Sequence, residues 1–490
     1  MGHSMADSSN RPQAAPPPVT RRTLLRAAPA ALAPLAAVRA DAPPDRPNII
    51  LLISDQFRWD CLGAMGLNPM NLTPNLDAMA ARGVLFRNAI SNQPVCAPAR
   101  ASIFTGQYPT RHGVWRNGLA LAPDAHTLAG SLRQAGYSAN YIGKWHLAGN
   151  DGAGNSPETR GPVAPEKRGG FLDLWQAANV LEFTSHAYEG ELYDRDGRPI
   201  RFSGVYRVDF MTGLARQFLR GAKSPFFLTL SYLETHHQND SDSFVPPREF
   251  AGRFQDFFVP PDLRPLPGTW GSQLPGYYGC VASIDQAVGA IRQTLVETGL
   301  DRNTIFLFTS DHGCHFKTRN SEYKRSPHES SIHVPLLAEG PGFNRSLTVP
   351  ELVSHVDLAP TLLAAAGVPV PSSMQGSSFL GLVDCRTEGW REEVHFEMSE
   401  FLTGRGLRTP RYTLAAAVPK RPGWKAAPSA ASYAEYMLYD LNADPCQHVN
   451  LAGNQHYAEV AAELRRRLSQ RIAEAGGPAA VIEPAHFPYP

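Results

Sequence analysis

The chain of 490 residues carries 46 Lys and Arg against 45 Asp and Glu, a formal net charge of +1. This balance excludes the overall basic surface that binding of nucleic acid or a strongly anionic polymer requires. The length is far more than one small core needs, and it fits one large α/β domain with an appendage.

The first forty residues have the layout of an export signal. The pair Arg21-Arg22 precedes an Ala- and Leu-rich stretch, residues 27–38, which runs into Arg39 and the small residue Ala40. A basic region, an apolar region and a small terminal residue make a signal peptide, and paired arginines indicate the Tat route. Residues 1–40 are therefore predicted to be a twin-arginine signal peptide, and the mature protein to be periplasmic or secreted. No later segment approaches the length of a membrane span.

Continuous apolar runs then predict strands that are buried on both faces of a sheet. They cover residues 47–53, 84–86, 137–142, 225–233 and 304–309, with predicted helices at 74–82, 127–134 and 277–298 between them. This alternation predicts an α/β fold for residues 41–382, a large mixed, mostly parallel sheet flanked by helices. The segments 150–210 and 240–275 are rich in Gly, Pro and charge, and are predicted to be long surface loops.

The last part of the chain, residues 383–490, has a different pattern. Strands are predicted at 393–398, 412–418 and 436–441, followed by a helix over 456–475. We expect a small antiparallel sheet with one helix. The six cysteines include no Cys-x-x-Cys pair, so neither zinc nor a disulfide framework is indicated. A disulfide between Cys385 and Cys446 stays open.

Polar side chains follow the ends of four of the predicted strands. They are Asp55 and Gln56, Lys144 and His146, His236, and Asp311 and His312. In open α/β sheets ligands bind outside the carboxyl ends of the strands, so these side chains can converge on one crevice. Asp55, Gln56, Asp311 and His312 supply two carboxylates, an amide oxygen and an imidazole. Such ligands favour Ca²⁺ or Mg²⁺, and the imidazole allows Mn²⁺.

A cysteine segment supplies the remaining motif. Cys96-Ala97-Pro98-Ala99-Arg100 is followed closely by Thr105-Gly106. One cysteine in an exported protein is ordinarily half of a disulfide or a buried apolar residue. Together with Gly143-Lys144-Trp145-His146 and Thr309-Ser310-Asp311-His312-Gly313, however, the segment resembles the formylglycine-dependent (type I) sulfatases of the alkaline phosphatase superfamily. The resemblance spans nearly the whole mature chain.

The resemblance implies that a formylglycine-generating enzyme oxidises Cys96 to formylglycine before folding. The aldehyde hydrates to a geminal diol, one oxygen of which is also a metal ligand and attacks sulfur. The alcohol leaves, and the second hydroxyl then collapses to the aldehyde and expels sulfate. The covalent intermediate therefore breaks down without attack by water.

The same resemblance assigns roles to further residues. Arg100 would hold the hydrate, Lys144 and Lys324 would bind sulfate, and His146 would orient the diol. His236 would contact sulfate or protonate the leaving oxygen, which a sugar ester requires. Lys317 and His237 are the rivals of Lys324 and His236. Asp240 is a further candidate for the substrate pocket, although a solvated loop position is as compatible with the sequence.

The predicted function is hydrolysis of a sulfate monoester of a carbohydrate or aryl alcohol, so the expected partner is a sulfated small molecule or saccharide. The combination of Gln56 with His312 also occurs in relatives that hydrolyse phosphonate monoesters and phosphodiesters, which is the second hypothesis. A third is a binding protein without catalysis, in which Cys96 stays unmodified.

Overall fold

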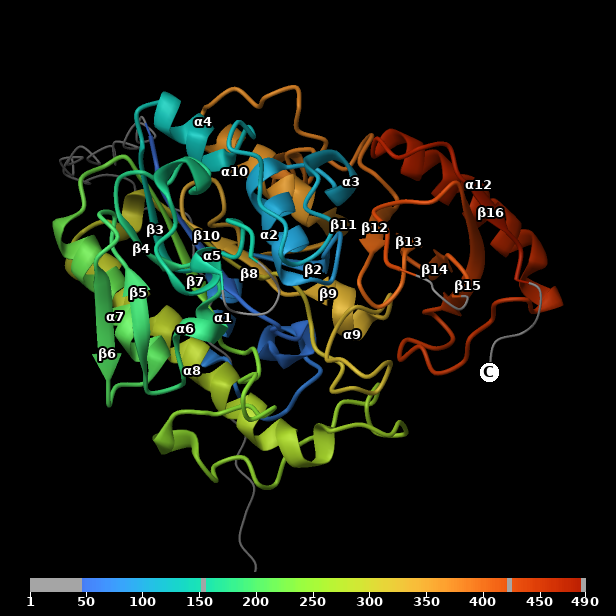
Figure 1. The fold of residues 1–490 in the computed structure, drawn as a ribbon, viewed down its shortest axis with the longest axis horizontal. Helices are drawn as coiled ribbons and strands as arrows, with labels where there is room; N and C mark the ends of the chain where they lie inside the picture. The colour runs from blue at the N-terminus through green and yellow to red at the C-terminus, as the bar shows by residue number, and fades with distance from the viewer. Residues whose placement is uncertain (1–45, 151–155, 421–424, 486–490) are drawn as a thin grey trace, which may run out of the picture. The chain divides into compact units, whose positions relative to one another are not determined.

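A computed structural model describes residues 46–150, 156–420 and 425–485, and the predicted signal peptide lies outside them. Within these ranges the strands form two sheets, one of eleven strands and one of five (Figure 1). No helix of the described part is long and apolar enough to cross a membrane.

The large sheet has the strand order β11-β2-β10-β8-β1-β7-β3-β4-β5-β6, and β9 pairs with β2. Its strands are β1 (Asn48–Ser54), β2 (Val84–Ile90), β3 (Ser138–Lys144), β4 (Trp175–Ala178), β5 (Glu189–Tyr193), β6 (Pro199–Ser203), β7 (Phe226–Tyr232), β8 (Thr304–Ser310), β9 (His333–Val334), β10 (Leu336–Glu339) and β11 (Leu347–Ser354). The strands β8, β1, β7, β3 and β4 are parallel neighbours, whereas β10 and the edge strands β5 and β6 are antiparallel. The predicted mixed, mostly parallel sheet is confirmed.

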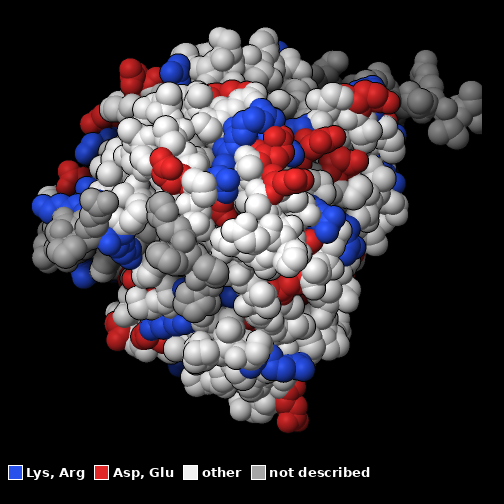
Figure 2. All heavy atoms as spheres, turned by 90° about the vertical axis from the view of Figure 1, so that its right-hand side faces the viewer, with Lys and Arg blue, Asp and Glu red and all other residues white. Residues whose placement is uncertain are grey.

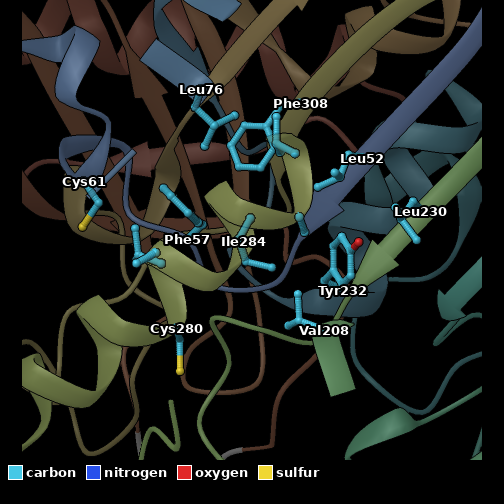
Figure 3. Close-up of a cluster of buried hydrophobic side chains, with 14 of the residues drawn as sticks. Leu52, Phe57, Cys61, Leu76, Val208, Leu230, Tyr232, Cys280, Ile284 and Phe308 are labelled. Carbon is cyan, nitrogen blue, oxygen red and sulfur yellow. The ribbon is translucent and has the colours of Figure 1, made fainter. Parts of the chain in front are cut away.

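Both faces of this sheet are buried, because alternate residues of its strands enter two separate hydrophobic cores. On β1, Leu52 faces one core and Leu51 the other. The first core lies under α1 (Pro74–Arg82), α7 (Arg207–Gly221) and α8 (Trp270–Glu297). Figure 3 shows Ile284 of α8 among side chains from the sheet. The second core lies under α2 (Cys96–Thr105), α4 (Leu128–Gln134), α10 (Leu358–Ala365) and α11 (Leu380–Val383). The remaining short helices of this part are α3 (Pro109–His112), α5 (Pro157–Arg160), α6 (Leu181–Thr184) and α9 (Glu329–Ile332).

Two predictions about loops need correction. The segment 150–210 is not only loop, because it contains β4, β5, β6, α5 and α6. β5 and β6 extend the edge of the sheet and are only partly buried, so they lack the continuous apolar run by which the central strands are recognised. The helix predicted at 277–298 begins earlier, at Trp270, with Pro275 inside it. The segment 240–275 is therefore loop only up to Thr269, apart from one short 3₁₀ turn.

The small sheet is built from β12 (Val394–Met398), β13 (Gly404–Arg408), β14 (Tyr412–Ala417), β15 (Ser432–Asp440) and β16 (Val481–Glu483). Its first four strands are antiparallel, whereas β16 lies parallel to β15. The helix α12 (Ala458–Glu474) packs Leu464 and Leu468 against Leu414 and Leu438. The predicted small sheet with a helix is thus present, with β13 and β16 in addition. The boundary at residue 382 stays a prediction.

The cysteines and the charges complete the description. All six cysteines are free thiols, so the Cys385–Cys446 disulfide left open by the sequence is not formed.

Figure 2 shows the face that carries α12, where positive and negative patches adjoin on a mostly uncharged surface. The α12 pair Arg466–Glu463 is one example of this pairing. The face therefore carries no large field of a single sign.

Candidate active site

The carboxyl ends of the central strands bring the predicted site residues together. Asp55 follows β1, Asp311 follows β8, and Lys144 is the last residue of β3. The parallel register places Ser54 of β1 opposite Ser310 of β8, so the residues that follow them leave the sheet at the same edge. The structure therefore brings these side chains together, as predicted.

Cys96 reaches the same edge as the first residue of α2. The preceding Val95 is extended, and Gly106, with φ of 65°, ends the helix. Pro98 is tolerated in the first turn because the N–H groups there have no partner within the helix. Arg100 follows Cys96 by about one helical turn and so lies on the same side of α2.

Four side chains form the centre of the site. One ligand atom from each of Asp55, Cys96, Asp311 and His312 lies within 4.8 Å of the others. The Cys96 Sγ is 3.3 Å from His312 Nε2 and 3.7 Å from Asp55 Oδ1. Gln56 donates from Nε2 to Cys314 Sγ, while its buried Oε1 has no hydrogen-bond partner among the described residues. A buried amide oxygen without a donor is suited to a cation.

The two central carboxylates are held by cations. Arg100 donates to Asp55 and to Asp311, both at 3.1 Å, and Lys144 Nζ lies 2.7 Å from Asp55 Oδ2. Burial alone would raise the pKa of Asp55, but Lys144 and its other cationic neighbours hold it well below the usual range. Burial and the negative charge of Asp55 raise the pKa of Asp311. Two such carboxylates repel each other, and a divalent cation between them would remove that repulsion.

The surroundings of Cys96 differ from those of a structural cysteine. Lys324 donates to its Sγ at 2.9 Å. Burial and Asp55 would raise the pKa of Cys96, but Lys144, Lys324 and His312 bring it well below the usual value. Burial instead raises the pKa of Cys280 to about 12 in an apolar core. The position of Cys96 is therefore built for a polar, reactive group.

The exposure of the side chains shows where the site opens. Asp55, Lys144 and Asp311 are wholly buried, whereas His146, His236 and Lys324 keep exposures of 5%, 6% and 4%. This outer group therefore lies nearest the solvent.

The outer group is itself ordered by hydrogen bonds. Lys324 Nζ lies 3.2 Å from His236 Nε2, and His236 donates from Nδ1 to the His237 carbonyl at 2.7 Å. That bond directs Nε2 toward Lys324. Within the described ranges, the buried Nδ1 of His146 has no hydrogen-bond partner.

The rival residues lie elsewhere. Lys317 pairs with Asp242 at 2.5 Å and lies over the Tyr323 ring, whereas Lys324 touches Cys96. His237 stacks between His236 and Tyr323, with ring centroids 4.3 and 4.2 Å away.

Asp240 is not brought into the central cluster. It lies on an exposed loop, where it forms a 3.0 Å ion pair with His186.

Two residues that the sequence did not single out contact the cluster. Glu182 of α6 lies 2.6 Å from Lys144 Nζ, and Ser231 accepts a hydrogen bond from Arg100 at 2.6 Å. The strand β4 runs parallel to β3 with Ala178 opposite Lys144, so the chain that leaves β4 passes the end of β3. The sequence around Glu182 does not indicate its contact with Lys144, because that contact depends on the pairing of β4 with β3.

Comparison with known proteins agrees with this geometry. The model of the Sulfatase family matches residues 47–368, and that of the N-sulphoglucosamine sulphohydrolase C-terminal region matches residues 322–474. An ulvan-active sulfatase of Formosa agariphila is 30% identical over 88% of this chain and 82% of its own length.

Solved structures give the same result. A crystal structure of the sulfatase yidJ of Bacteroides fragilis has a TM-score of 0.76 at 26% identity, and the match covers 90% of this chain and 98% of that one. A protein solved in complex with its substrate D-glucosamine-2-N,6-O-disulfate shares the fold, with a TM-score of 0.72 at 22% identity over 88% of this chain and 98% of that one. The chain belongs to the sulfatase family of the alkaline phosphatase superfamily, and it is a sulfatase.

Proposed function

We propose that the protein hydrolyses a sulfate monoester of a saccharide, with aryl sulfates as accessory substrates, through formylglycine made from Cys96 and a divalent metal ion. The observation that carries this proposal is the position of Cys96. Its Sγ lies among three groups that could hold a metal ion, and Lys324 Nζ contacts both this Sγ and His312 Nε2. A nucleophile there meets both the metal and the cations that would neutralise a transferring sulfate.

The residues around the centre fit a hard divalent cation, for which we propose Ca²⁺, with Mg²⁺ and Mn²⁺ as alternatives. Asp55, Asp311 and His312 would hold it together with the oxygen at position 96, and the free Oε1 of Gln56 would complete the set. The bound ion would supply positive charge beside the sulfate and lower the cost of two adjacent carboxylates.

The chain's own residues would divide the work as follows. Arg100 fixes the two carboxylates and with them the orientation of the first turn of α2. Lys144 and Lys324 offset the charge that grows on the sulfate oxygens in the transition state. The proton shared between Lys324 Nζ and His236 Nε2 lies at the outer side of the site, where the leaving alcohol oxygen would receive it. His146 lies beside the cluster and would orient the hydrated aldehyde.

Maturation and export complete the proposal. Conversion of Cys96 requires a formylglycine-generating enzyme as a partner during synthesis, and the twin-arginine signal would send the folded protein to the periplasm or beyond. The names and ligands of the relatives, an ulvan-active sulfatase and a protein that binds D-glucosamine-2-N,6-O-disulfate, support a sulfated saccharide as substrate.

Phosphonate monoesters and phosphodiesters stay the second candidate class, because Gln56 makes the metal site less negative than a second aspartate would. The two classes differ in the atom attacked, sulfur or phosphorus. Parallel rates on 4-nitrophenyl sulfate and on a phenyl phosphonate monoester decide between them, and a higher kcat/KM for the phosphonate would replace our first proposal.

The direct test is the mass of the tryptic peptide that spans residues 88–100, taken from protein made with the modifying enzyme present. Conversion of the thiol to the aldehyde makes the peptide lighter by about 18 Da. Cys96→Ala protein should lose sulfate ester hydrolysis by a factor of at least about 10³. An unmodified cysteine in active protein, or full activity of Cys96→Ala, would refute the formylglycine mechanism.

A further inference from the structure

Glu182 holds an unused hydrogen-bond acceptor beside the catalytic cluster. Its Oε1 pairs with Lys144 at 2.6 Å. The side chain is only 6% exposed. Its Oε2 is buried and has no hydrogen-bond partner in the described part of the chain. A carboxylate oxygen that is buried without a donor costs free energy, so such an atom in a native site calls for a partner.

The neighbours of Glu182 belong to the proposed catalytic machinery. Lys144 is the lysine to which we assign sulfate binding, and Glu182 also interacts electrostatically with His146 and Cys96. Burial alone would raise the pKa of Glu182, but Lys144 and His146 lower it, which keeps the group an anionic acceptor. A hydrogen-bond donor carried by the substrate would satisfy this oxygen.

The residues that follow Glu182 line a cavity. Phe183, Thr184 and His186 form part of its wall, and its volume is about 600 Å³, within the range of small-molecule sites. Arg201 and Glu191 also line the cavity and provide hydrogen-bond donors and acceptors, and Phe183 provides an apolar surface.

Two features of the chain relate the cavity to the catalytic cluster. Phe183 is the neighbour of Glu182 in sequence, and His186 pairs with Asp240, four residues beyond His236. The direction of the strands supports this relation. β5 begins, and β6 ends, at the end of the sheet where the parallel strands have their carboxyl ends. The cavity and Lys144 therefore lie at the same end of the sheet.

We propose that Glu182 and the adjoining cavity recognise the alcohol part of the substrate, and that this alcohol is a saccharide with a hydroxyl near the sulfate ester that donates to Glu182 Oε2. The inference rests on the proposed function and adds to it the residue that selects saccharide over aryl sulfates. Asp240, predicted from the sequence to bind substrate, would then act at the rim of the cavity through His186.

The test compares a substrate with its analogue in two proteins. A panel of hexose and N-acetylhexosamine monosulfates first identifies the sugar sulfate with the highest kcat/KM. That compound and its deoxy analogue, which lacks the hydroxyl next to the ester, are then assayed with the wild type and with Glu182→Gln. Any general effect of the substitution through Lys144 appears with both compounds and cancels in the ratio.

We expect the wild type to lose about 10–100-fold in kcat/KM on the deoxy compound, because a hydrogen bond to a charged group is lost. Glu182→Gln should lose less than about threefold between the same two compounds. Glu297→Gln, a surface substitution at the end of α8, is the matched control and should behave as the wild type. An equal loss in all three proteins would overturn the role of Glu182.

A binding measurement separates this inference from the proposed function. If modified wild type hydrolyses no sulfate, the proposed function fails, and calorimetry with Cys96→Ala protein then tests recognition alone. Tighter binding of the sugar sulfate than of its deoxy analogue, abolished by Glu182→Gln, would support the recognition site. Equal binding of both compounds would refute it.

Discussion

Replacement of Glu329 by glutamine should destabilise the protein strongly, because Glu329 joins the large sheet to the small one. It opens α9, and its Oε1 accepts from Arg408 of β13 at 2.8 Å while its Oε2 pairs with His333 of β9 at 2.9 Å. The side chains of Glu329 and Arg408 are 11% and 6% exposed. The pair therefore lies in a low-dielectric environment where solvent screens it weakly.

The magnitude follows from what the substitution leaves behind. In Glu329→Gln the guanidinium of Arg408 stays buried without its countercharge, although hydrogen bonds to the amide oxygen at position 329 and to the Thr409 carbonyl can form. Removal of one partner from a buried ion pair costs about 3–5 kcal/mol, because the other charge is left uncompensated. Glu463→Gln removes an exposed pair with Arg466 on α12, and it serves as the matched control that should leave stability unchanged.

The assay is denaturant unfolding of both variants as a function of pH. Burial alone would raise the pKa of Glu329, but Arg408 and His333 hold it well below its usual value of 4.5. A lowered pKa means that the carboxylate stabilises the fold fully above pH 4.5 and loses this contribution as the pH falls further. The difference between wild type and Glu329→Gln should thus be largest near pH 7 and shrink below pH 4.5. A small difference at pH 7, or one that does not change down to pH 3, would refute the reasoning.

Three further predictions concern the site. Chelation of the metal ion should lower both activity and Tm, and addition of Ca²⁺ should restore them, because an ion bound only by the folded state stabilises that state. An unchanged Tm would contradict the metal site. Lys324→Ala should reduce kcat/KM by about 10² or more, whereas Lys317→Ala should change it less than about tenfold, and the reverse ranking would reassign the sulfate-binding lysine. Gly143→Ala should lower the free energy of unfolding by about 1–3 kcal/mol, since Gly143 has φ of 111° and a Cβ there would lie 2.0 Å from the Ser231 carbonyl oxygen. A thermal melt equal to that of the wild type would show that β3 can shift to make room.

The sequence predicted the centre of the fold well because that centre is apolar on both faces. Residues 49–53 and 305–308 are entirely apolar, and the structure has strands there over Asn48–Ser54 and Thr304–Ser310. The polar residues that follow these strands converge because parallel strands end at one edge, which is a rule of sheet geometry rather than of this sequence.

The parts that escaped prediction depend on tertiary contacts. The strand β13 reads Gly-Arg-Gly-Leu-Arg, a sequence without strand propensity, and it is stable because Arg405 and Arg408 find buried carboxylates. The contact of Glu182 with Lys144 can be predicted only when the pairing of β4 with β3 is known. The contact of Lys324 with Cys96 joins a loop to the start of α2, 228 residues earlier, a relation that no local pattern contains.

The burial of the cysteine segment would set a time limit on the proposed maturation. Cys96 and Arg100 are at most 1% exposed, Pro98 is buried, and the chain on either side of them is packed in the core of the fold. The proposed modifying enzyme would therefore compete with folding for this segment, and the ratio of the two rates would set the fraction of active molecules. Faster synthesis or a more stable α2 would lower specific activity without altering a single contact in the finished protein. Slower folding would raise it, so yield and activity can move in opposite directions between expression hosts.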